Sequence, residues 1–163
     1  MSGFVYLRPL NMTYIRAEGP YADSALEAWD KVYKWLDDTG MRASVTARYG
    51  LMLDDPEATA PAKCRYDACI EMVDGYQDWI TKDFAYRRLP GGAYARRRHV
   101  GAATLQAATL KLRHDWSPEN GLAFDARRPV IQIYLDDPKK MVDEKRRFDV
   151  LIPVATQARH DAA

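Results

Sequence analysis

The segment LDDPEATAPAKCRYD, Leu53 to Asp67, returns 82 positions later as LDDPKKMVDEKRRFD, Leu135 to Asp149. The two segments align without a gap and share seven of fifteen residues, where average composition would give about one identity. This agreement indicates an internal duplication. We therefore expect a fold of two related halves, with any functional site where the halves meet.

Length and composition limit the kinds of protein to consider. A chain of 163 residues is long enough for one domain made of two packed halves. No apolar run approaches the roughly 18 residues of a membrane span, and the start shows no signal-peptide pattern, so we expect a cytoplasmic protein without membrane contact. The net charge of +1 gives no reason to expect a nucleic-acid partner. Neither Cys64 and Cys69 nor the three histidines have metal-ligand spacing, and the two cysteines are not placed to bridge.

The first half predicts a strand, a helix and two further strands. A strand is expected over 12–17, and the segment 4–7 either extends it or pairs with it. A helix follows, because apolar residues recur at helical spacing at Ala25, Trp29, Val32, Tyr33 and Leu36. Two strands, 47–53 and 64–73, then flank the first copy of the repeated segment.

The second half repeats this order. A strand is expected over 93–99, and a helical stripe follows at Leu105, Ala108, Thr109, Leu112 and Trp116. Strands are expected at 130–135 and 146–154. The predicted fold is α+β, a single domain over 1–163. It has tandem duplicated strand-helix-strand-strand modules at about 3–73 and 91–155, joined by a connector at 74–90, and forms an antiparallel sheet with two main helices.

The repeated Asp-Asp-Pro motif is best explained by turn chemistry. Aspartate hydrogen-bonds its own backbone, and proline fixes φ at the start of a loop. No nucleophile motif, glycine-rich phosphate loop or histidine-centred triad is present in the sequence. We therefore predict no catalytic residues, no metal and no cofactor, and favour a protein that is not an enzyme.

The run Arg96-Arg97-Arg98-His99 is the other unusual feature. In a strand these side chains alternate between two faces, so at least one arginine points inward or to an edge and needs a partner. One interpretation is a charged edge strand that discourages aggregation. The other is recognition of an anionic ligand or an acidic protein surface. Direct nucleic-acid binding is disfavoured, because the sequence shows no helix-turn-helix and no stacking platform within the run.

Four passages carry a resemblance to a known family. They are YIRAEGPY at 14–21, LDDPEATAPAKCRYDACIEMV at 53–73, GGAYARRRHVG at 91–101, and QIYLDDPKK with DVLIPV at 132–140 and 149–154. In these the chain resembles the GyrI-like small-molecule-binding domains, which also serve as effector-binding domains of AraC-type and MerR-type transcription regulators. The resemblance implies an aromatic-lined, hydrophobic ligand cleft between the two modules.

The chain departs from the family at one expected ligand-binding position. Members that bind lipophilic cations have a glutamate facing the cleft just before an Ile-Tyr pair, where this chain has Gln132 and its first-half counterpart is Gly50. An amide carries no charge to attract a cation but offers a donor and an acceptor. The alternative is that Gln132 faces solvent, and large aromatics at such spacing are more often core residues than pocket lining. The predicted ligand-binding residues are Gln132, Tyr134, Trp116, Trp29, Tyr33, Met52 and Gly50.

The function predicted from these features is that of a stand-alone protein binding a hydrophobic or aromatic small molecule. Two alternatives come from other classes. One is a protein that binds DNA gyrase as an inhibitor or protects it from toxins, and a transcription regulator is a further candidate partner. The other is a hydrolase that opens cyclopropane rings of toxic natural products. This is weakened because Gln132 cannot act as a general base at neutral pH.

Overall fold

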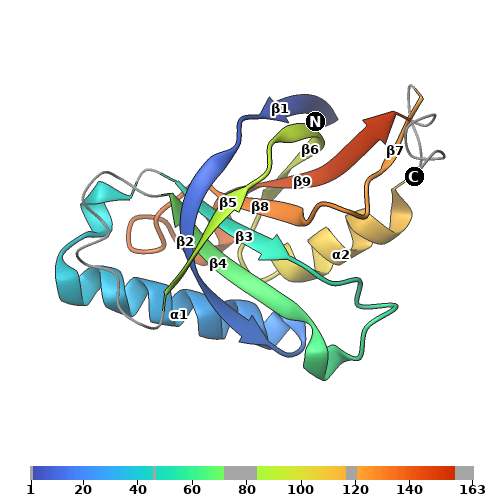
Figure 1. The fold of residues 1–163 in the computed structure, drawn as a ribbon. Helices are drawn as coiled ribbons and strands as arrows, with labels where there is room; N and C mark the ends of the chain where they lie inside the picture. Colours follow the sequence, from blue (N-terminus) through green and yellow to red (C-terminus); the bar gives the residue numbers. More distant parts are fainter. Residues whose placement is uncertain (1, 46, 72–83, 117–120, 157–163) are drawn as a thin grey trace. The chain divides into compact units, whose positions relative to one another are not determined.

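The computed structural model describes residues 2–45, 47–71, 84–116 and 121–156. It contains two α-helices, α1 (Tyr21–Thr39) and α2 (Leu105–Asp115), with antiparallel strands (Figure 1). The chain divides into two compact units. The α1 unit comprises residues 9–89, and the α2 unit comprises residues 1–8 and 90–163. These elements confirm the α+β fold of two strand-helix-strand-strand modules.

The α1 unit is a four-stranded antiparallel sheet with one helix. Its strands lie in the order β3 (Arg48–Met52), β4 (Arg65–Glu71), β2 (Leu10–Glu18) and β5 (Ala85–Leu89). The helix α1 packs on β2 and β4. Its buried face includes Ala25, Ala28, Trp29, Val32 and Leu36, which recur at helical spacing and so form one stripe.

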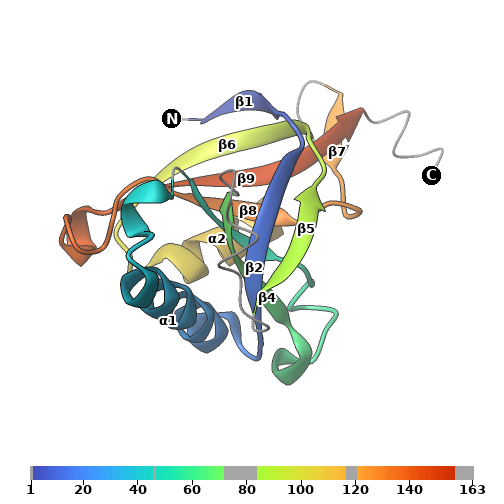
Figure 2. The same cartoon turned by 60° about the vertical axis from the view of Figure 1, so that its left-hand side comes forward.

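The α2 unit has the same plan and one additional short strand. Its strands lie in the order β1 (Ser2–Leu7), β6 (Gly92–Val100), β9 (Arg147–Thr156) and β8 (Val130–Tyr134), and β7 (Leu122–Phe124) pairs with the end of β9. Figure 2 shows β1, β6 and β9 side by side. The helix α2 contacts β6 and β9.

The edge strand that precedes β2 pairs with the second module, and the edge strand that precedes β6 pairs with the first. β1 pairs with β6, with Leu7 opposite Gly92, and β5 pairs with β2, with Leu89 opposite Leu10. Each of these residues has its counterpart 82 positions away. The expectation that segment 4–7 extends or pairs with strand 12–17 is therefore wrong. A proline follows β1 and β5 closely, and the residue before a proline favours extended backbone, so the chain continues onward instead of reversing into a tight hairpin.

Part of the predicted connector is therefore a strand. Ala85–Leu89 forms β5, although the sequence assigned it to a spacer. Residues 72–83 lie outside the described residues, and with them the predicted end of the strand at 64–73 and most of the predicted connector. Strand β7 was also not predicted, because three residues are too few to show an alternating pattern.

The repeated turn has the same interactions in both copies. In the first, the Arg65 guanidinium donates to the Asp54 carboxylate at 2.9 and 2.8 Å, and the Arg65 backbone N–H donates to it at 2.8 Å. In the second, Arg147 donates to Asp136 at 3.1 and 2.9 Å, and from its backbone at 2.8 Å. The following aspartate accepts a backbone N–H two residues on: Asp55 from Glu57 at 2.9 Å and Asp137 from Lys139 at 2.8 Å. Asp-Asp-Pro is thus a structural turn, as the sequence predicted.

Candidate ligand-binding site

One face of the α2-unit sheet carries the polar residues that the sequence singled out. Gln132 on β8 pairs with Val150 on β9, and Val150 pairs with Arg97 on β6. Directly paired residues point to the same side of a sheet, so these three form a row across one face, with Gln132 and Arg97 roughly 10 Å apart. The helix α2 covers this face, because its side chains bond to Gln132.

Gln132 is fully buried in a polar network. Its Nε2 donates to Gln106 Oε1 and to Thr109 Oγ1, both at 2.9 Å. The Tyr134 hydroxyl donates to Gln132 Oε1 at 3.5 Å, and the Tyr134 ring packs edge-on against Phe148 at 5.1 Å. The solvent-facing alternative for Gln132 is therefore wrong. Burying an amide without partners would be unfavourable, and this network supplies them.

Two adjoining pockets lie on the same unit. The larger has a volume of about 360 Å³ and is lined from α2, β6 and β9 by Arg97, Arg98, His99, Ala108, Lys111, Leu112, Asp115, Trp116 and Val150. The smaller, of about 150 Å³, is lined by Gly3, Phe4, Ala95, Arg96, Arg97, Leu112, Trp116 and Ile152. Arg97, Leu112 and Trp116 belong to both. The indole Nε1 of Trp116 is buried and has no hydrogen-bond partner among the described residues.

The larger pocket is rich in cationic groups. Arg98 donates to Asp149 at 2.6 Å, and Lys111 donates to Asp115 at 2.7 Å on the exposed side of α2. The hydrogen bond from Lys111 lowers the pKa of Asp115. His99 Nε2 lies 3.1 Å from the Gly101 carbonyl oxygen and 2.8 Å from Thr104 Oγ1. Three cationic side chains and one carboxylate therefore line this pocket.

The predicted first-half residues lie on the equivalent face of the α1 unit. Trp29 Nε1 donates to the Tyr66 hydroxyl at 3.0 Å, and the Trp29 ring stacks on Tyr33 at 5.4 Å. Met52 pairs with Tyr66, and Gly50 pairs with Ala68, so both share the side that α1 covers. Trp29, Met52 and Gly50 are buried, whereas Tyr33 is partly exposed. Their role in binding a ligand stays a prediction.

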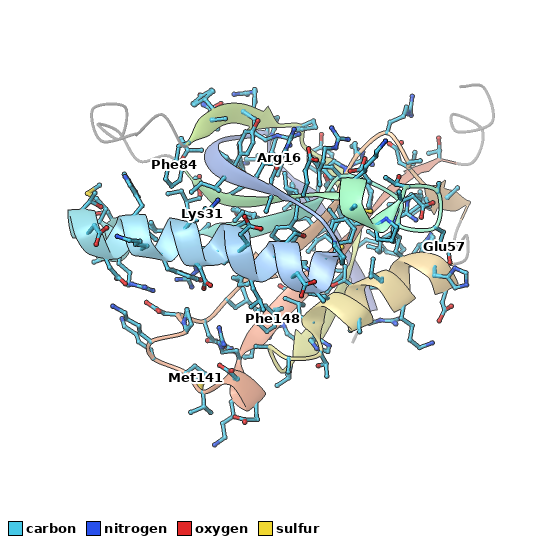
Figure 3. The ribbon with its side chains drawn as sticks, turned by 90° about the horizontal axis from the view of Figure 1, so that it is seen from below. Arg16, Lys31, Glu57, Phe84, Met141 and Phe148 are labelled. Carbon is cyan, nitrogen blue, oxygen red and sulfur yellow. The ribbon has the colours of Figure 1, made fainter. Side chains whose placement is uncertain are left out.

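The α1 unit has a pocket of its own. It has a volume of about 440 Å³ and is lined by Ile15, Arg16, Lys31, Lys34, Trp35, Asp38 and Phe84, of which Arg16, Lys31 and Phe84 are labelled in Figure 3. Arg16 is the counterpart of Arg98 at the 82-residue offset, and both bind a carboxylate on the neighbouring strand. None of the predicted ligand-binding residues lines this pocket.

The structure thus joins Gln132 to Tyr134 and Trp29 to Tyr33, and it places Trp116 on the pockets beside the arginine run. Sequence reasoning missed Gln106 as a partner of Gln132. Gln106 lies three residues before Thr109 and so shares its helix face, which was the available signal. It also missed Phe4, because nothing in the local pattern shows that β1 borders β6.

The described residues contain neither a candidate membrane-spanning helix nor a candidate metal site. Within the described residues, no helix is both long and apolar enough to cross a membrane. Across those same ranges, no group of three or more histidine, cysteine, aspartate or glutamate side chains could hold a metal ion.

A duplicated α+β domain with a pocket beside the helix of each unit is typical of small ligand-binding domains. The chain belongs to the GyrI-like family, since the family model for the GyrI-like small molecule binding domain matches residues 2–155. This is a small-molecule-binding domain family, and the earlier resemblance is confirmed.

Curated relatives are similar over most of their length. YgiV of Escherichia coli strain K12, named a probable transcriptional regulator, is 28% identical over 77% of this chain and 78% of its own. A protein of Cronobacter turicensis named DNA gyrase inhibitor is 27% identical over 85% of this chain and 86% of its own.

Solved structures share the fold at low sequence identity. The C-terminal domain of EcmrR superposes with a TM-score of 0.69 at 15% identity, covering 96% of this chain and 98% of that one. SAV2435 bound to tetraphenylphosphonium gives 0.65 at 14% identity, with coverage of 99% and 98%. A hydrolase from Listeria innocua gives 0.63 at 17% identity, with coverage of 94% and 91%.

Proposed function

We propose that this protein binds a hydrophobic or aromatic small molecule through the α2 unit, at the two adjoining pockets next to Gln132. Family membership supports binding of a small molecule. The observation that carries the proposal is Trp116, which lines both pockets and buries an indole N–H without a partner among the described residues. Such a donor is costly to leave unsatisfied, and a ligand acceptor would satisfy it. A ligand held between the two modules stays a prediction from the resemblance.

We expect Gln132 to act on the ligand indirectly, because it is fully buried and lines neither pocket but pairs with Val150, which lines the larger one. Its amide donates to Gln106 and Thr109 on α2, and its Oε1 accepts from the Tyr134 hydroxyl, so the network fixes the helix that carries pocket residues. Because the amide carries no charge, it adds no attraction for a cation. This separates the present chain from family members that use a glutamate at this position.

The test is a titration with a panel of lipophilic cations, neutral aromatics and aromatic anions, tetraphenylphosphonium among the cations. Binding is followed by tryptophan fluorescence and by melting temperature. A ligand at 100 times its Kd stabilises the folded state by about 2.7 kcal/mol. We expect Trp116→Phe to abolish most of the fluorescence change and Gln132→Leu to weaken binding, whereas Trp35→Phe, in the α1 unit, leaves both intact. Failure of the whole panel, or stabilisation by cations alone that Gln132→Leu abolishes, would contradict the proposal.

The contribution of the α1-unit residues can be tested separately. The Tyr33 side chain is partly exposed and its ring stacks on Trp29. The Arg42 guanidinium lies 4.7 Å from the Tyr33 ring centroid. If these aromatics also bind the ligand, Tyr33→Ala weakens binding beyond its effect on stability. If they serve only as core, the variant lowers the melting temperature and leaves ligand affinity unchanged.

A second candidate function is binding to DNA gyrase, favoured by the relative named DNA gyrase inhibitor. Inhibition of supercoiling by the purified protein, with purified gyrase, would support it. Hydrolysis of a cyclopropane-containing alkylator is the weaker alternative, because the buried amide of Gln132 cannot serve as the base. Mass spectrometry of such a compound after incubation tests it, and an unchanged mass across a panel would eliminate the hydrolase alternative.

A further inference from the structure

We propose that the natural ligand is an organic anion with an aromatic or similarly flat apolar body, such as an aromatic carboxylate or sulfonate. This inference rests on the proposed function and names the ligand class for the same pockets. It differs from lipophilic-cation binding in the sign of the charge that the site attracts.

The charge of the larger pocket supports an anion. Arg97, Arg98 and Lys111 line it, against the single carboxylate of Asp115. Arg98 is bound to Asp149, and Lys111 to Asp115. The Gln132 amide, in the same cross-strand row as Arg97, adds no negative charge. With Asp149 counted beside Asp115, three cationic groups meet two carboxylates, so the local charge balance is positive and favours an anion over a cation.

Arg97 is best placed to bind the acidic group. It lines both pockets and lies on the sheet face that α2 covers. A guanidinium is planar and binds a carboxylate or sulfonate through two parallel hydrogen bonds, which fixes the orientation of the ligand as well as its affinity. Trp116 also lines both pockets, and its buried indole N–H, which has no partner among the described residues, offers a further donor to an anionic oxygen.

The smaller pocket suits the apolar part of such a molecule. Apart from its two arginines, its lining is apolar or glycine: Gly3, Phe4, Ala95, Leu112, Trp116 and Ile152. Its volume of about 150 Å³ matches that of engineered apolar cavities that bind benzene. A ligand with its acidic group at Arg97 and its ring against Trp116 would fill both pockets together.

A matched set of naphthalene compounds tests the sign of the charge. Naphthalene-2-sulfonate, naphthalene-2-sulfonamide and 2-naphthyltrimethylammonium share a ring system and are anionic, neutral and cationic. Calorimetry on the full chain at low salt is expected to show the sulfonate binding at least about tenfold more tightly than the others, with affinity falling as salt is added. Equal or tighter binding of the neutral or cationic compound overturns this inference and leaves the proposed function intact. Absence of binding by all three counts against both.

Four variants locate the effect. Arg97→Gln is expected to remove the preference for the anion, and Arg97→Lys to retain part of it, with melting curves confirming that both fold. Asp115→Asn, which removes the carboxylate, is expected to tighten sulfonate binding severalfold. Lys31→Gln removes a charge from the α1-unit pocket and is the matched control. If Lys31→Gln weakens the anion and Arg97→Gln does not, the inference is wrong.

Discussion

Replacing Arg16 with methionine tests how the α1 unit stabilises a buried carboxylate. The Asp67 side chain is fully buried on the central strand β4. It accepts hydrogen bonds from Arg16 Nε at 2.7 Å and Arg16 Nη2 at 3.0 Å, and from Arg87 Nη1 at 3.0 Å. The bond to Asp67 raises the pKa of Arg16. Without these partners the carboxylate would be a buried, unpaired charge.

The size of the effect follows from this geometry. Removing one partner of a buried ion pair costs about 3–5 kcal/mol. Arg87 remains as a counter-ion and the Arg16 side chain is 35% exposed, so we expect Arg16→Met to cost about 2–3 kcal/mol. Arg87→Met, which removes one bond, should cost about 1–2 kcal/mol. The double variant should exceed the sum by about 1–2 kcal/mol, because the last counter-ion is then lost.

Urea unfolding followed by tryptophan fluorescence measures these differences, since Trp29 and Trp35 lie on α1 in the same unit. Arg88→Met is the matched control. Arg88 also lies on β5, but it bonds to exposed Asn11 at 3.0 Å, so its loss should cost under about 0.5 kcal/mol. If Arg16→Met is no worse than Arg88→Met, or the two Asp67 partners prove additive, the reasoning fails.

Three further predictions concern pH, backbone and thiols. The hydrogen bond from Arg65 lowers the pKa of Asp54. The stability that this bond contributes is therefore present above the unfolded-state pKa and is lost as pH falls through the folded-state pKa. Asp54→Asn should flatten the acid side of a plot of melting temperature against pH, and an unchanged acid side would contradict this. Gly92→Ala should lower the free energy of unfolding, measured in urea, by about 1–3 kcal/mol. The reason is that φ at Gly92 is +132° and the new Cβ would lie 2.5 Å from Arg128 Nη1. An unchanged free energy of unfolding would contradict this and would show that the Arg128 guanidinium moves away easily. Burial raises the pKa of the Cys64 and Cys69 thiols. A thiol reagent at pH 8 should therefore label neither cysteine in the folded protein and both cysteines in urea. Rapid labelling of the folded protein would refute this.

Much of the fold could be predicted from local patterns. The helical stripe from Ala25 to Leu36 and the alternation along β9 reflect burial of one face, which residue spacing records directly. Local patterns do not identify the strand with which an edge strand pairs. Phe4 on β1 and its counterpart Tyr86 on β5 lie in strands whose alternation is compatible with either unit. The strand with which β1 or β5 pairs depends on the direction that the chain takes after the adjacent proline.

The candidate site was only partly predictable for the same reason. Alternation shows that Gln132 and Tyr134 share a face, and that the arginine run is split between two faces. It could not show that this face is covered by α2, or that Gln106 and Thr109 satisfy the buried amide. These contacts join residues 26 and 23 positions apart, beyond the reach of any periodic pattern.

The sequence by itself determined the duplication, the order of the two strand-helix-strand-strand modules and the Asp-Asp-Pro turns, because each depends on residue spacing or on local turn chemistry. Tertiary structure alone decided that β1 borders β6 and that Arg97 and Trp116 line common pockets. Pockets form from side chains on several elements, and their shape and charge depend on strand register and helix placement. The repeated residues therefore indicate the local structure that both halves share, whereas a binding site forms only when several elements have packed together.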